Sequence, residues 1–260
     1  MKIGYVQTAP IFGEKEQNFK HVEDSLRNKK ADLIVLPELF ATGYTFVSKE
    51  EAEFFAEDLN GITARFLKKM AKSTGAIVVG GFIEREDSDI FNSSMVVSNT
   101  SVIGAYRKLH LYYKEKLWFS PGNQSIKVYE LNDFKLGIMI CFDWIFPETA
   151  RTLAILGADI IAHPANLVLP YCQKAMVTRC LENRVFAITS NRIGQEKRGM
   201  DNFNFTGASQ ITSFDGTILS SAPSDRTHVD FVDIDIMNAR NKKLNDFNDI
   251  IADRRTEYYF

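Results

Sequence analysis

Three side chains with reactive chemistry follow apolar segments of the chain. Glu38 comes directly after the run DLIVLP, Lys108 follows GAYR, and Cys141 follows KLGIMI. Side chains at strand ends of α/β proteins are held by a rigid sheet, so such positions often form ligand sites. A carboxylate, an ammonium group and a thiol can together perform covalent acyl transfer. Taken singly, each also has a structural interpretation: an exposed acid, a solvated lysine and a core thiol.

The positions of these side chains depend on short apolar runs that are typical of buried strands. Two further pairs of strands are predicted to be hairpins, one with a turn at Ser98–Ser101 and one with the turn dipeptide Asp215-Gly216. The buried strands are expected at residues 2–7, 33–36, 76–82, 135–141, 159–163 and 185–190.

Helical periodicity is present in three segments between the strands. Apolar residues share one helical face around Val22, around Leu67 and around Leu153. Pro147 suits the first turn of the third helix, and Gly75 stands where the second helix is expected to end. Strands therefore alternate first with helices and then with hairpins, which predicts mixed sheets covered by helices rather than a purely parallel sheet.

The chain contains no long linker rich in Pro or Ser, so residues 1–260 are predicted to form a single domain. The first half contains KIGYVQ followed by ADLIVLPELFATGY, and the second half contains KLGIMI followed by ADIIAHPANLVLPY. This internal similarity favours two packed halves with a site between them. Two unrelated strand–helix–strand units would also look alike, so both interpretations stay open.

Composition and charge exclude several classes of function. Apolar residues make up 45% of the chain and charged residues 25%, as in ordinary globular proteins. A formal net charge of −2 gives no field that would attract nucleic acid or an anionic membrane. No segment approaches the roughly 20 apolar residues of a membrane span, and the opening MKIGYVQTAP is expected to be a strand rather than a signal peptide. We therefore expect a cytoplasmic protein without nucleic-acid or membrane partners.

The three cysteines show no pattern of pairing. An odd number of widely spaced cysteines is typical of reduced thiols in the cytoplasm. The four histidines are scattered, so no zinc-binding pattern is present and no metal ion is expected. Cys172 and Cys180 lie eight residues apart on a predicted helix and are expected to pack in the core.

The segments LPELFATGY, YRKLHL and MICFDWIFPE resemble the three signature segments of the nitrilase, or carbon-nitrogen hydrolase, superfamily, in the family's order. The similarity extends from Lys2 to the C-terminal DRRTEYYF. The resemblance implies an α/β fold, a four-layer αββα sandwich of the nitrilase type. It also implies a catalytic triad of Glu38, Lys108 and Cys141, and the family's additional acid falls on Glu115.

The resemblance further implies a cysteine-dependent hydrolysis of a non-peptide carbon–nitrogen bond. Glu38 would take the proton of Cys141, and the thiolate would attack an amide or nitrile carbon. Lys108 and the backbone N–H of Phe142 would stabilise the oxyanion, and Glu115 would position Lys108 or pass a proton to the leaving amine. Water activated by Glu38 would then hydrolyse the thioester, so neither a metal nor an organic cofactor is required.

Loop residues around the triad are expected to bind the substrate, and a helix starting at Pro147 is expected to favour the thiolate of Cys141. Asp143 is expected to be structural, bonding nearby backbone N–H groups. The candidate substrate-binding residues are Tyr44, Tyr112, Phe142, Trp144 and Asn166.

The preferred function is hydrolysis of a small linear amide to a carboxylic acid and ammonia. Relatives that hydrolyse N-carbamoyl-D-amino acids carry arginines shortly after the nucleophile, where this chain has Trp144 and Ile145. The alternatives are a nitrilase acting on small aliphatic nitriles, an N-carbamoyl amidohydrolase, and a catalytically silent binding or scaffold member of the family.

The C-terminal tail LNDFNDIIADRRTEYYF is expected to take part in assembly. Its last residues, Tyr258, Tyr259 and Phe260, have no helical or strand face to bury within one subunit. Relatives use this tail and the helices after the cysteine to form dimers, so a homodimer or a higher homo-oligomer is expected.

Overall fold

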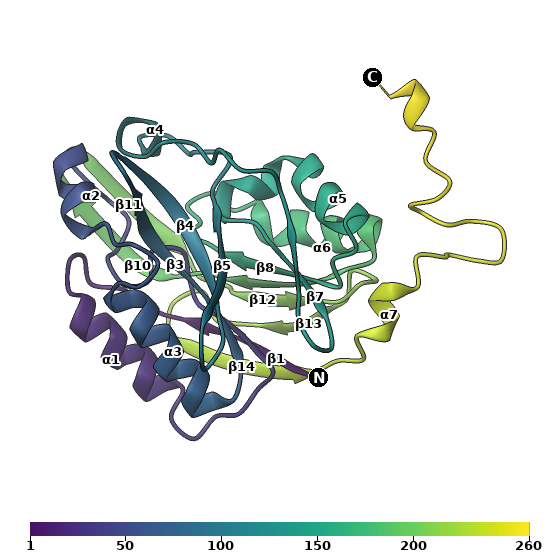
Figure 1. The fold of residues 1–260 in the computed structure, drawn as a ribbon, viewed down its shortest axis with the longest axis horizontal. Helices are drawn as coiled ribbons and strands as arrows, with labels where there is room; N and C mark the ends of the chain where they lie inside the picture. The colour runs from purple at the N-terminus through teal and green to yellow at the C-terminus, as the bar shows by residue number, and fades with distance from the viewer. Residues whose placement is uncertain (260) are drawn as a thin grey trace.

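Two six-stranded sheets lie at the centre of the computed structural model, which describes residues 1–259 (Figure 1). The first sheet contains, in spatial order, β14 (His228–Asp233), β1 (Lys2–Gln7), β2 (Leu33–Val35), β3 (Ile77–Glu86), β4 (Asp89–Val97) and β5 (Val102–Arg107). The second sheet contains β13 (Ile218–Ser221), β12 (Gln210–Thr212), β9 (Phe186–Ser190), β8 (Ile160–Pro164), β7 (Lys135–Ile138) and β6 (Val128–Glu130).

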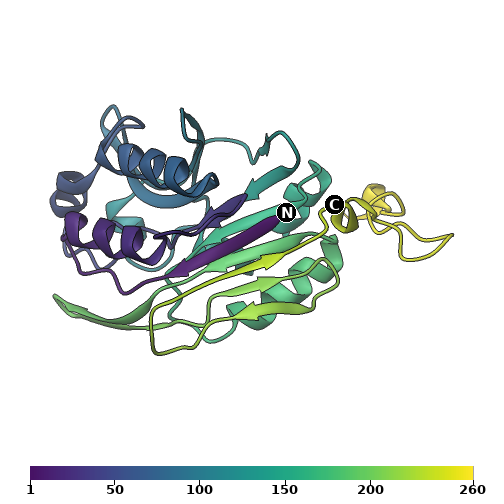
Figure 2. The ribbon, with the colours of Figure 1, turned by 90° about the horizontal axis from the view of Figure 1, so that it is seen from below.

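Each sheet carries a pair of helices on its outer face (Figure 2). The helices α1 (Lys15–Ser25) and α3 (Ile62–Thr74) cover the first sheet. The helices α5 (Pro147–Ile155) and α6 (Cys172–Asn183) cover the second. The expected four-layer αββα sandwich is therefore confirmed.

Strand β2 shows how the sequence produces these layers. Leu33 and Val35 belong to the apolar cluster that joins the two sheets, whereas Ile34 belongs to the cluster under α1 and α3. Successive side chains of a strand point to opposite faces, so a strand buried on both sides must be apolar throughout. The unbroken run LIVL meets this requirement, and burial on both faces fixes the strand firmly at the centre of the molecule.

The two halves of the chain repeat one arrangement. Strands β1, β2 and β3 run parallel, and strands β7, β8 and β9 also run parallel. A parallel bridge from Thr8 to Arg192 connects the two halves just beyond the ends of β1 and β9. The internal similarity in the sequence thus corresponds to two parallel three-stranded units, and the loops that follow β2, β7 and β8 meet at one end.

The strand expected at residues 135–141 is shorter than predicted. Strand β7 ends at Ile138, and Met139 still donates its N–H to the carbonyl of Ala162 at 3.1 Å. Cys141 then adopts a left-handed conformation with φ of 41° and begins a 3₁₀ turn, η1 (Cys141–Ile145). A left-handed residue cannot continue a strand, so the cysteine stands on a sharp turn rather than at the strand end.

The remaining elements lie at the margins of the sandwich. Both expected hairpin turns are confirmed: Ser98 donates its N–H to the Ser101 carbonyl at 2.9 Å, and Gly216 has a left-handed φ of 84°. Within residues 1–259 no helix has the length and apolar character needed to cross a membrane. The outlying elements are α2 (Lys49–Phe55), α4 (Glu115–Trp118), β10 (Ile193–Arg198), β11 (Asp201–Thr206), α7 (Met237–Arg240) and η2 (Thr256–Tyr258).

Candidate active site

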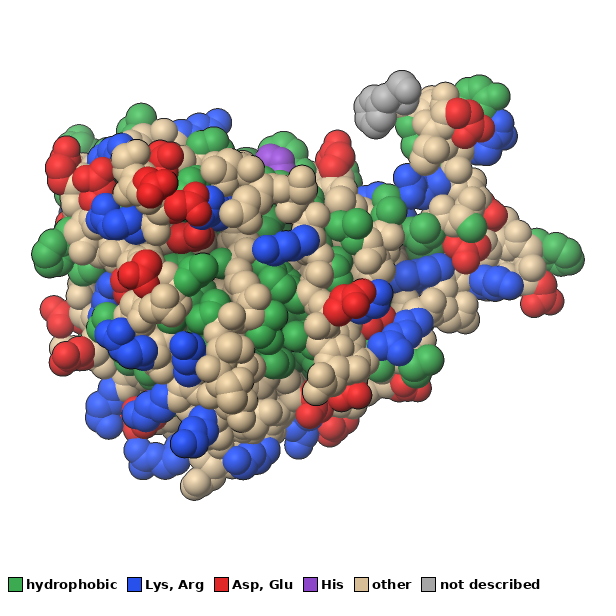
Figure 3. All heavy atoms as spheres, in the orientation of Figure 1, with side chains coloured by type: hydrophobic (Ala, Val, Ile, Leu, Met, Phe, Trp, Pro, Cys, Tyr) green, Lys and Arg blue, Asp and Glu red, His purple; other side chains and the backbone are tan. Residues whose placement is uncertain are grey.

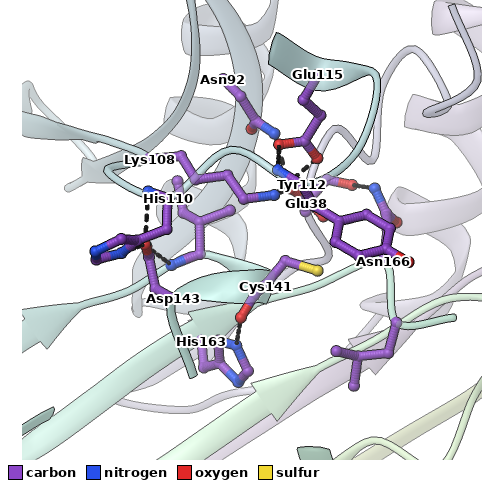
Figure 4. A network of polar contacts seen from close by, with 12 residues as sticks. Glu38, Asn92, Lys108, His110, Tyr112, Glu115, Cys141, Asp143, His163 and Asn166 are labelled. Carbon is purple, nitrogen blue, oxygen red and sulfur yellow. Dashed lines mark hydrogen bonds and ion pairs between the residues drawn. The ribbon is translucent and has the colours of Figure 1, made fainter. Parts of the chain in front are cut away.

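Four loops bring the candidate catalytic residues together between the two sheets (Figure 4). Glu38 lies just after β2, Lys108 directly after β5, Glu115 at the start of α4, and Cys141 at the start of η1. All four side chains are buried. Residues from four separate segments therefore share one water-poor site, as the sequence predicted for strand ends.

Lys108 is held between two carboxylates. Its Nζ donates to Glu38 Oε1 at 2.7 Å and to Glu115 Oε1 at 2.8 Å. Burial alone would lower the pKa of Lys108, but the charges of Glu115 and Glu38 outweigh burial and raise this pKa. The ammonium group is thus a permanent positive charge in the site.

Glu115 is the more constrained of the two acids. The backbone N–H of Tyr112 donates to Glu115 Oε2 at 3.0 Å. Burial raises the pKa of Glu115, while the charge of Lys108 acts in the opposite direction. With Lys108 on one oxygen and Tyr112 on the other, this carboxylate is fixed in place.

Glu38 keeps one oxygen free. Its Oε1 accepts from Lys108 and from Asn92 Nδ2, the latter at 2.7 Å, whereas the buried Oε2 has no hydrogen-bond partner in the structure. A buried carboxylate oxygen without a partner is costly and therefore suggests a use. The free oxygen can accept a proton from a nearby thiol.

Asn92 was not predicted from the sequence as a site residue. It lies in β4 within the run IFNSSMVV, where three polar residues interrupt an otherwise apolar buried strand. Its side chain is buried and donates to Glu38. A polar cluster inside a buried strand is the signal that could have identified this residue.

Asp143 holds the turn that carries the cysteine. Its Oδ2 accepts from the backbone N–H of Ile140 at 2.9 Å and from the hydroxyl of Tyr106 at 2.8 Å. Its Oδ1 accepts from the backbone N–H of His110 at 3.1 Å. The structural role expected for Asp143 is therefore confirmed, because it ties the loop after β5 to the residue before Cys141.

The Cys141 thiol is not shifted toward the thiolate in the free protein, so any effect of the helix N-terminus at Pro147 does not dominate. Burial raises the pKa of the Cys141 thiol well above its usual value, and the charge of Glu38 raises it further, against the opposing effect of Lys108. The turn η1 also separates Cys141 from the helix that begins at Pro147. The cysteine is therefore a protonated thiol at rest and needs a base to become a nucleophile.

Cys141 opens onto a small pocket with apolar walls. Its empty space, including the part open to solvent, is about 240 Å³. Of the described residues that line it, only Cys141 could carry a charge, and only after it loses its proton. The lining residues are Tyr112, Cys141, Phe142, Trp144, Asn166, Leu167, Val168 and Leu169.

Tyr44, also expected to bind substrate, does not line this pocket, but it lies close enough to the cluster that the charges of Glu115, Glu38 and Cys141 act on its phenol. It lines a second pocket of about 250 Å³ together with Glu115, Trp118, Asp201 and other residues. Burial, followed by the charge of Glu115, raises the pKa of the Tyr44 phenol, so this hydroxyl stays protonated. Four of the five expected substrate-binding residues thus surround Cys141, and Tyr44 stands on the side of Glu115.

Two polar side chains near the pocket differ in whether their polar atoms already have hydrogen-bond partners. Asn166 donates through Nδ2 to the Glu38 carbonyl at 2.9 Å, while its buried Oδ1 has no partner in the structure. Arg179 donates to the Trp144 carbonyl at 3.3 Å and pairs with Glu182 at 3.1 Å. Asn166 therefore keeps a buried acceptor without a partner beside the pocket, whereas the guanidinium of Arg179 is engaged outside it.

Known proteins resemble the whole chain. The carbon-nitrogen hydrolase family matches residues 2–243. A nitrilase of Pyrococcus abyssi (strain GE5 / Orsay) is 46% identical over 264 residues, which cover 100% of this chain and 99% of that protein. An (R)-stereoselective amidase of a Pseudomonas species is 33% identical, with 98% of this chain and 92% of the amidase covered. An amidase from Nesterenkonia sp. AN1 shares the fold, with a TM-score of 0.81 at 23% identity over 99% of this chain and 97% of that chain.

Proposed function

The chain belongs to the carbon-nitrogen hydrolase family and is an enzyme of that class, and we propose that it hydrolyses a small neutral linear amide through a thioester on Cys141. One observation carries the proposal. Cys141 opens onto an apolar pocket and lies beside a buried cluster of Glu38, Lys108 and Glu115, in which Glu38 Oε2 has no partner.

The first step is acylation of the cysteine. Glu38 Oε2 takes the thiol proton as the Cys141 sulfur attacks the amide carbon. Lys108 and the backbone N–H of Phe142 stabilise the negative charge that develops on the substrate oxygen. A positioned base contributes about 10²–10⁴-fold and one oxyanion donor about 10²–10³-fold to the rate.

The second step releases ammonia and then the acid. The carbon–nitrogen bond breaks as the protonated Glu38 gives its proton to the departing nitrogen, directly or by way of Glu115, which leaves a thioester on Cys141. Glu38, again a carboxylate, takes a proton from water as the water oxygen attacks the thioester carbon. The carbon–sulfur bond breaks, the sulfur regains a proton, and the carboxylic acid leaves. In a mutant of the Nesterenkonia amidase, acrylamide adds to the active-site cysteine by Michael addition, so the cysteine of that protein is a nucleophile.

The pocket favours a neutral acyl group. A bidentate arginine contact to a substrate carboxylate is worth roughly 1.5–3 kcal/mol, or about 10–150-fold in affinity. The positions after the nucleophile hold Trp144 and Ile145, and Arg179 is bound to the Trp144 carbonyl and to Glu182. N-carbamoyl-D-amino acids are therefore expected to be poor substrates. The free Oδ1 of Asn166 can accept an N–H of a neutral amide.

Hydrolysis of small aliphatic nitriles is the second candidate. The relative that is 46% identical is a nitrilase, and the same thiolate can attack a nitrile carbon. A silent binding protein is disfavoured because the base, the lysine and the cysteine are all present, with Lys108 paired to Glu38 and the charges of both acting on the Cys141 thiol.

Ammonia release distinguishes these functions. We expect short neutral amides or nitriles to be hydrolysed, with kcat/KM for N-carbamoyl-D-amino acids at least about 10-fold lower, as the missing arginine contact predicts. Intact-mass analysis after mixing with a small amide or ester should reveal an acyl group on Cys141. A higher kcat/KM for an N-carbamoyl-D-amino acid than for every neutral amide and nitrile would contradict the substrate class, and no acylation by any of them would contradict the enzyme mechanism.

A further inference from the structure

A buried histidine contacts the backbone of the nucleophile. His163 lies in β8 and is fully buried, and its Nε2 is 3.0 Å from the carbonyl oxygen of Cys141 (Figure 4). Its other ring nitrogen, Nδ1, is 3.1 Å from Oγ1 of Thr189 in β9. The ring therefore connects two central strands of the second sheet to the turn that carries the sulfur.

These two partners determine which ring nitrogen carries the proton. A carbonyl oxygen can only accept, so Nε2 must donate its N–H to Cys141. In the neutral ring, Nδ1 then accepts a hydrogen bond from the Thr189 hydroxyl. Burial lowers the pKa of His163 to about 4, so the ring is neutral near pH 7.

The carbonyl held by His163 and the N–H of Phe142 belong to the same peptide group. In a trans peptide the C=O and N–H bonds point in opposite directions, and none of the described peptide bonds is cis. Fixing the oxygen at His163 therefore directs the Phe142 N–H to the opposite side. A donor on the carbonyl also polarises the peptide and strengthens its N–H as a hydrogen-bond donor.

Cys141 needs such a constraint because its backbone is unfavourable. A φ of 41° is rare for a residue with a side chain and persists only when surrounding contacts enforce it. Asp143 fixes the N–H of the preceding residue, Ile140, at 2.9 Å. His163 fixes the carbonyl on the other side of Cys141, so the peptide that follows the sulfur is held at its oxygen.

We propose that His163 is a positioning residue that aims the Phe142 N–H at the oxyanion formed during attack by Cys141. The proposal rests on the function proposed above, in which that N–H stabilises the oxyanion. His163 does not line the substrate pocket, and it affects one chemical step, the formation of the oxyanion.

The test compares two reactions of the same sulfur. Acylation by p-nitrophenyl acetate passes through an oxyanion: the sulfur bonds to the acetyl carbon, p-nitrophenolate leaves, and the thiol proton goes to Glu38. Alkylation by iodoacetamide forms a carbon–sulfur bond with loss of iodide, the thiol proton again goes to Glu38, and no oxyanion is created. The ratio of the two rates therefore reports the oxyanion donor separately from the reactivity of the thiol.

The variants are His163→Met, which removes the donor at similar volume, and His163→Gln, whose amide N–H can replace Nε2–H. Thr189→Val, with Thr189→Ser as its matched control, removes only the hydroxyl that bonds to Nδ1 of the ring. Losing an oxyanion donor altogether costs about 10²–10³-fold, so misdirecting it in His163→Met should slow the p-nitrophenolate burst roughly 10- to 100-fold. Alkylation should stay within about 3-fold of the wild type, and His163→Gln should recover most of the burst rate. Thr189→Val should show a smaller loss than His163→Met, and Thr189→Ser no loss.

Three results would overturn the proposal. Equal slowing of the burst and of alkylation in Thr189→Val and His163→Met would show that the histidine merely maintains the fold around the thiol. An unchanged burst in both variants, or a wild-type protein that is alkylated at Cys141 without any burst, would show that no such oxyanion donor is being aimed. Failure of the proposed amidase function is detected separately, as absence of ammonia release by a wild type that still gives the burst.

Discussion

At the scale of single residues, the central problem of this site is how a buried thiol becomes a nucleophile. Burial raises the pKa of Cys141, yet moving its proton to Glu38 Oε2 leaves the net charge of the cluster unchanged. Lys108 lies against Glu38 and opposes the rise in the Cys141 pKa, so it stabilises the negative charge on either partner. Proton transfer within the site thus avoids the full penalty of creating an isolated buried anion.

Replacing the nucleophile should abolish turnover without unfolding the protein. We expect Cys141→Ala to lose all measurable hydrolysis and to change the free energy of unfolding by no more than about 1–2 kcal/mol. Cys172→Ala and Cys180→Ala are the matched controls, because both thiols are packed in the core as predicted, and they should keep activity. Ammonia release and thermal unfolding measure the two quantities. Substantial activity in Cys141→Ala would refute the mechanism.

Lys108→Arg should also be nearly inactive although it keeps the charge. The ammonium group fits between two carboxylate oxygens at 2.7 and 2.8 Å, and a planar guanidinium is too wide for this fully buried space. We expect kcat to fall by about 10²–10³-fold, the effect of losing one oxyanion donor. Steady-state kinetics tests this, with circular dichroism to verify folding. Wild-type kinetics in Lys108→Arg would show that Lys108 takes no part in catalysis.

His163 should make stability depend on pH in a defined window. Its pKa is lowered from 6.5 to about 4 by burial, with Asp143 opposing and Lys108 reinforcing the change. Between these values the unfolded chain binds a proton that the folded chain does not, so stability is complete above pH 6.5 and falls with acidification by about 1.4 kcal/mol per pH unit. Denaturant titrations of His163→Gln should show a shallower decline over this window. If the free energy of unfolding fell equally with acidification in both proteins, His163 would not be a buried neutral histidine with a lowered pKa.

At the scale of elements, the sequence predicted strands better than the turns at their ends. Apolar runs identified β1, β2 and β8 closely because these strands are buried on both faces and are therefore mostly apolar. The end of β7 was misplaced because the run KLGIMI remains apolar through the turn into Cys141. Backbone conformation at that residue depends on a local contact of Asp143 and on a tertiary contact of His163, and the tertiary contact leaves no local pattern.

The candidate site could be predicted in its reactive residues but not in its supporting contacts. Glu38, Lys108 and Cys141 follow recognisable segments, and the structure brings them together. The support from Asn92 requires the register of β4 against the neighbouring strands, and the separate pocket of Tyr44 requires the placement of a loop. The polar run in β4 marks Asn92 as unusual, but neither its contact with Glu38 nor the position of Tyr44 can be read from local sequence, because both depend on the packing of distant segments.

One glycine lets strand β3 approach the loop that carries the base. A side chain at Gly81 would place its Cβ 2.8 Å from Glu38 Cα and closer still to the backbone nitrogen of Leu39. Gly81→Ala should therefore displace Glu38, lower kcat by at least about 10-fold and destabilise the fold by roughly 1–3 kcal/mol.

Gly80→Ala is the matched control on the opposite face of the same strand. Its new methyl group would meet only the side-chain ends of Leu67 and Phe40, each at 3.0 Å, which can shift. We expect this variant to lose some stability and to retain kcat. Steady-state kinetics and denaturant unfolding of both variants test this. Equal kcat values for Gly81→Ala and Gly80→Ala would show that the close approach of β3 does not position Glu38.

At the scale of the whole molecule, the C-terminal segment projects away from the sandwich (Figure 3). Tyr258 and Tyr259 are largely exposed, as the sequence predicted, while Phe260 lies outside the described residues. Phe247 in the same segment is 91% exposed. An extended segment with several exposed aromatic and apolar side chains is unfavourable in an isolated chain and is typical of a surface that a partner covers.

The outer helices present a similar surface next to this segment. Leu156, just after α5, and Leu181 on α6 are exposed, and a groove between these helices and the tail is lined by Arg151, Glu182 and Tyr259 among others. A second copy of the chain could cover both the helices and the tail in one two-fold interface, since such an interface uses the same patch on each subunit. We therefore propose a homodimer or a larger homo-oligomer.

Removing residues 244–260 should weaken this assembly. A stable interface buries at least about 1,000 Å², and deleting the tail removes the exposed aromatic residues that would contribute much of its apolar area. We expect light scattering of the full-length protein at micromolar concentration to give at least twice the mass of one chain, and the truncated protein to give a lower mass. The truncation leaves the four layers and Cys141 intact, so the burst with p-nitrophenyl acetate should persist and serves as the control for folding. A full-length protein that is monomeric under these conditions would contradict the proposal, and an unchanged mass after truncation would assign the interface to the helices alone.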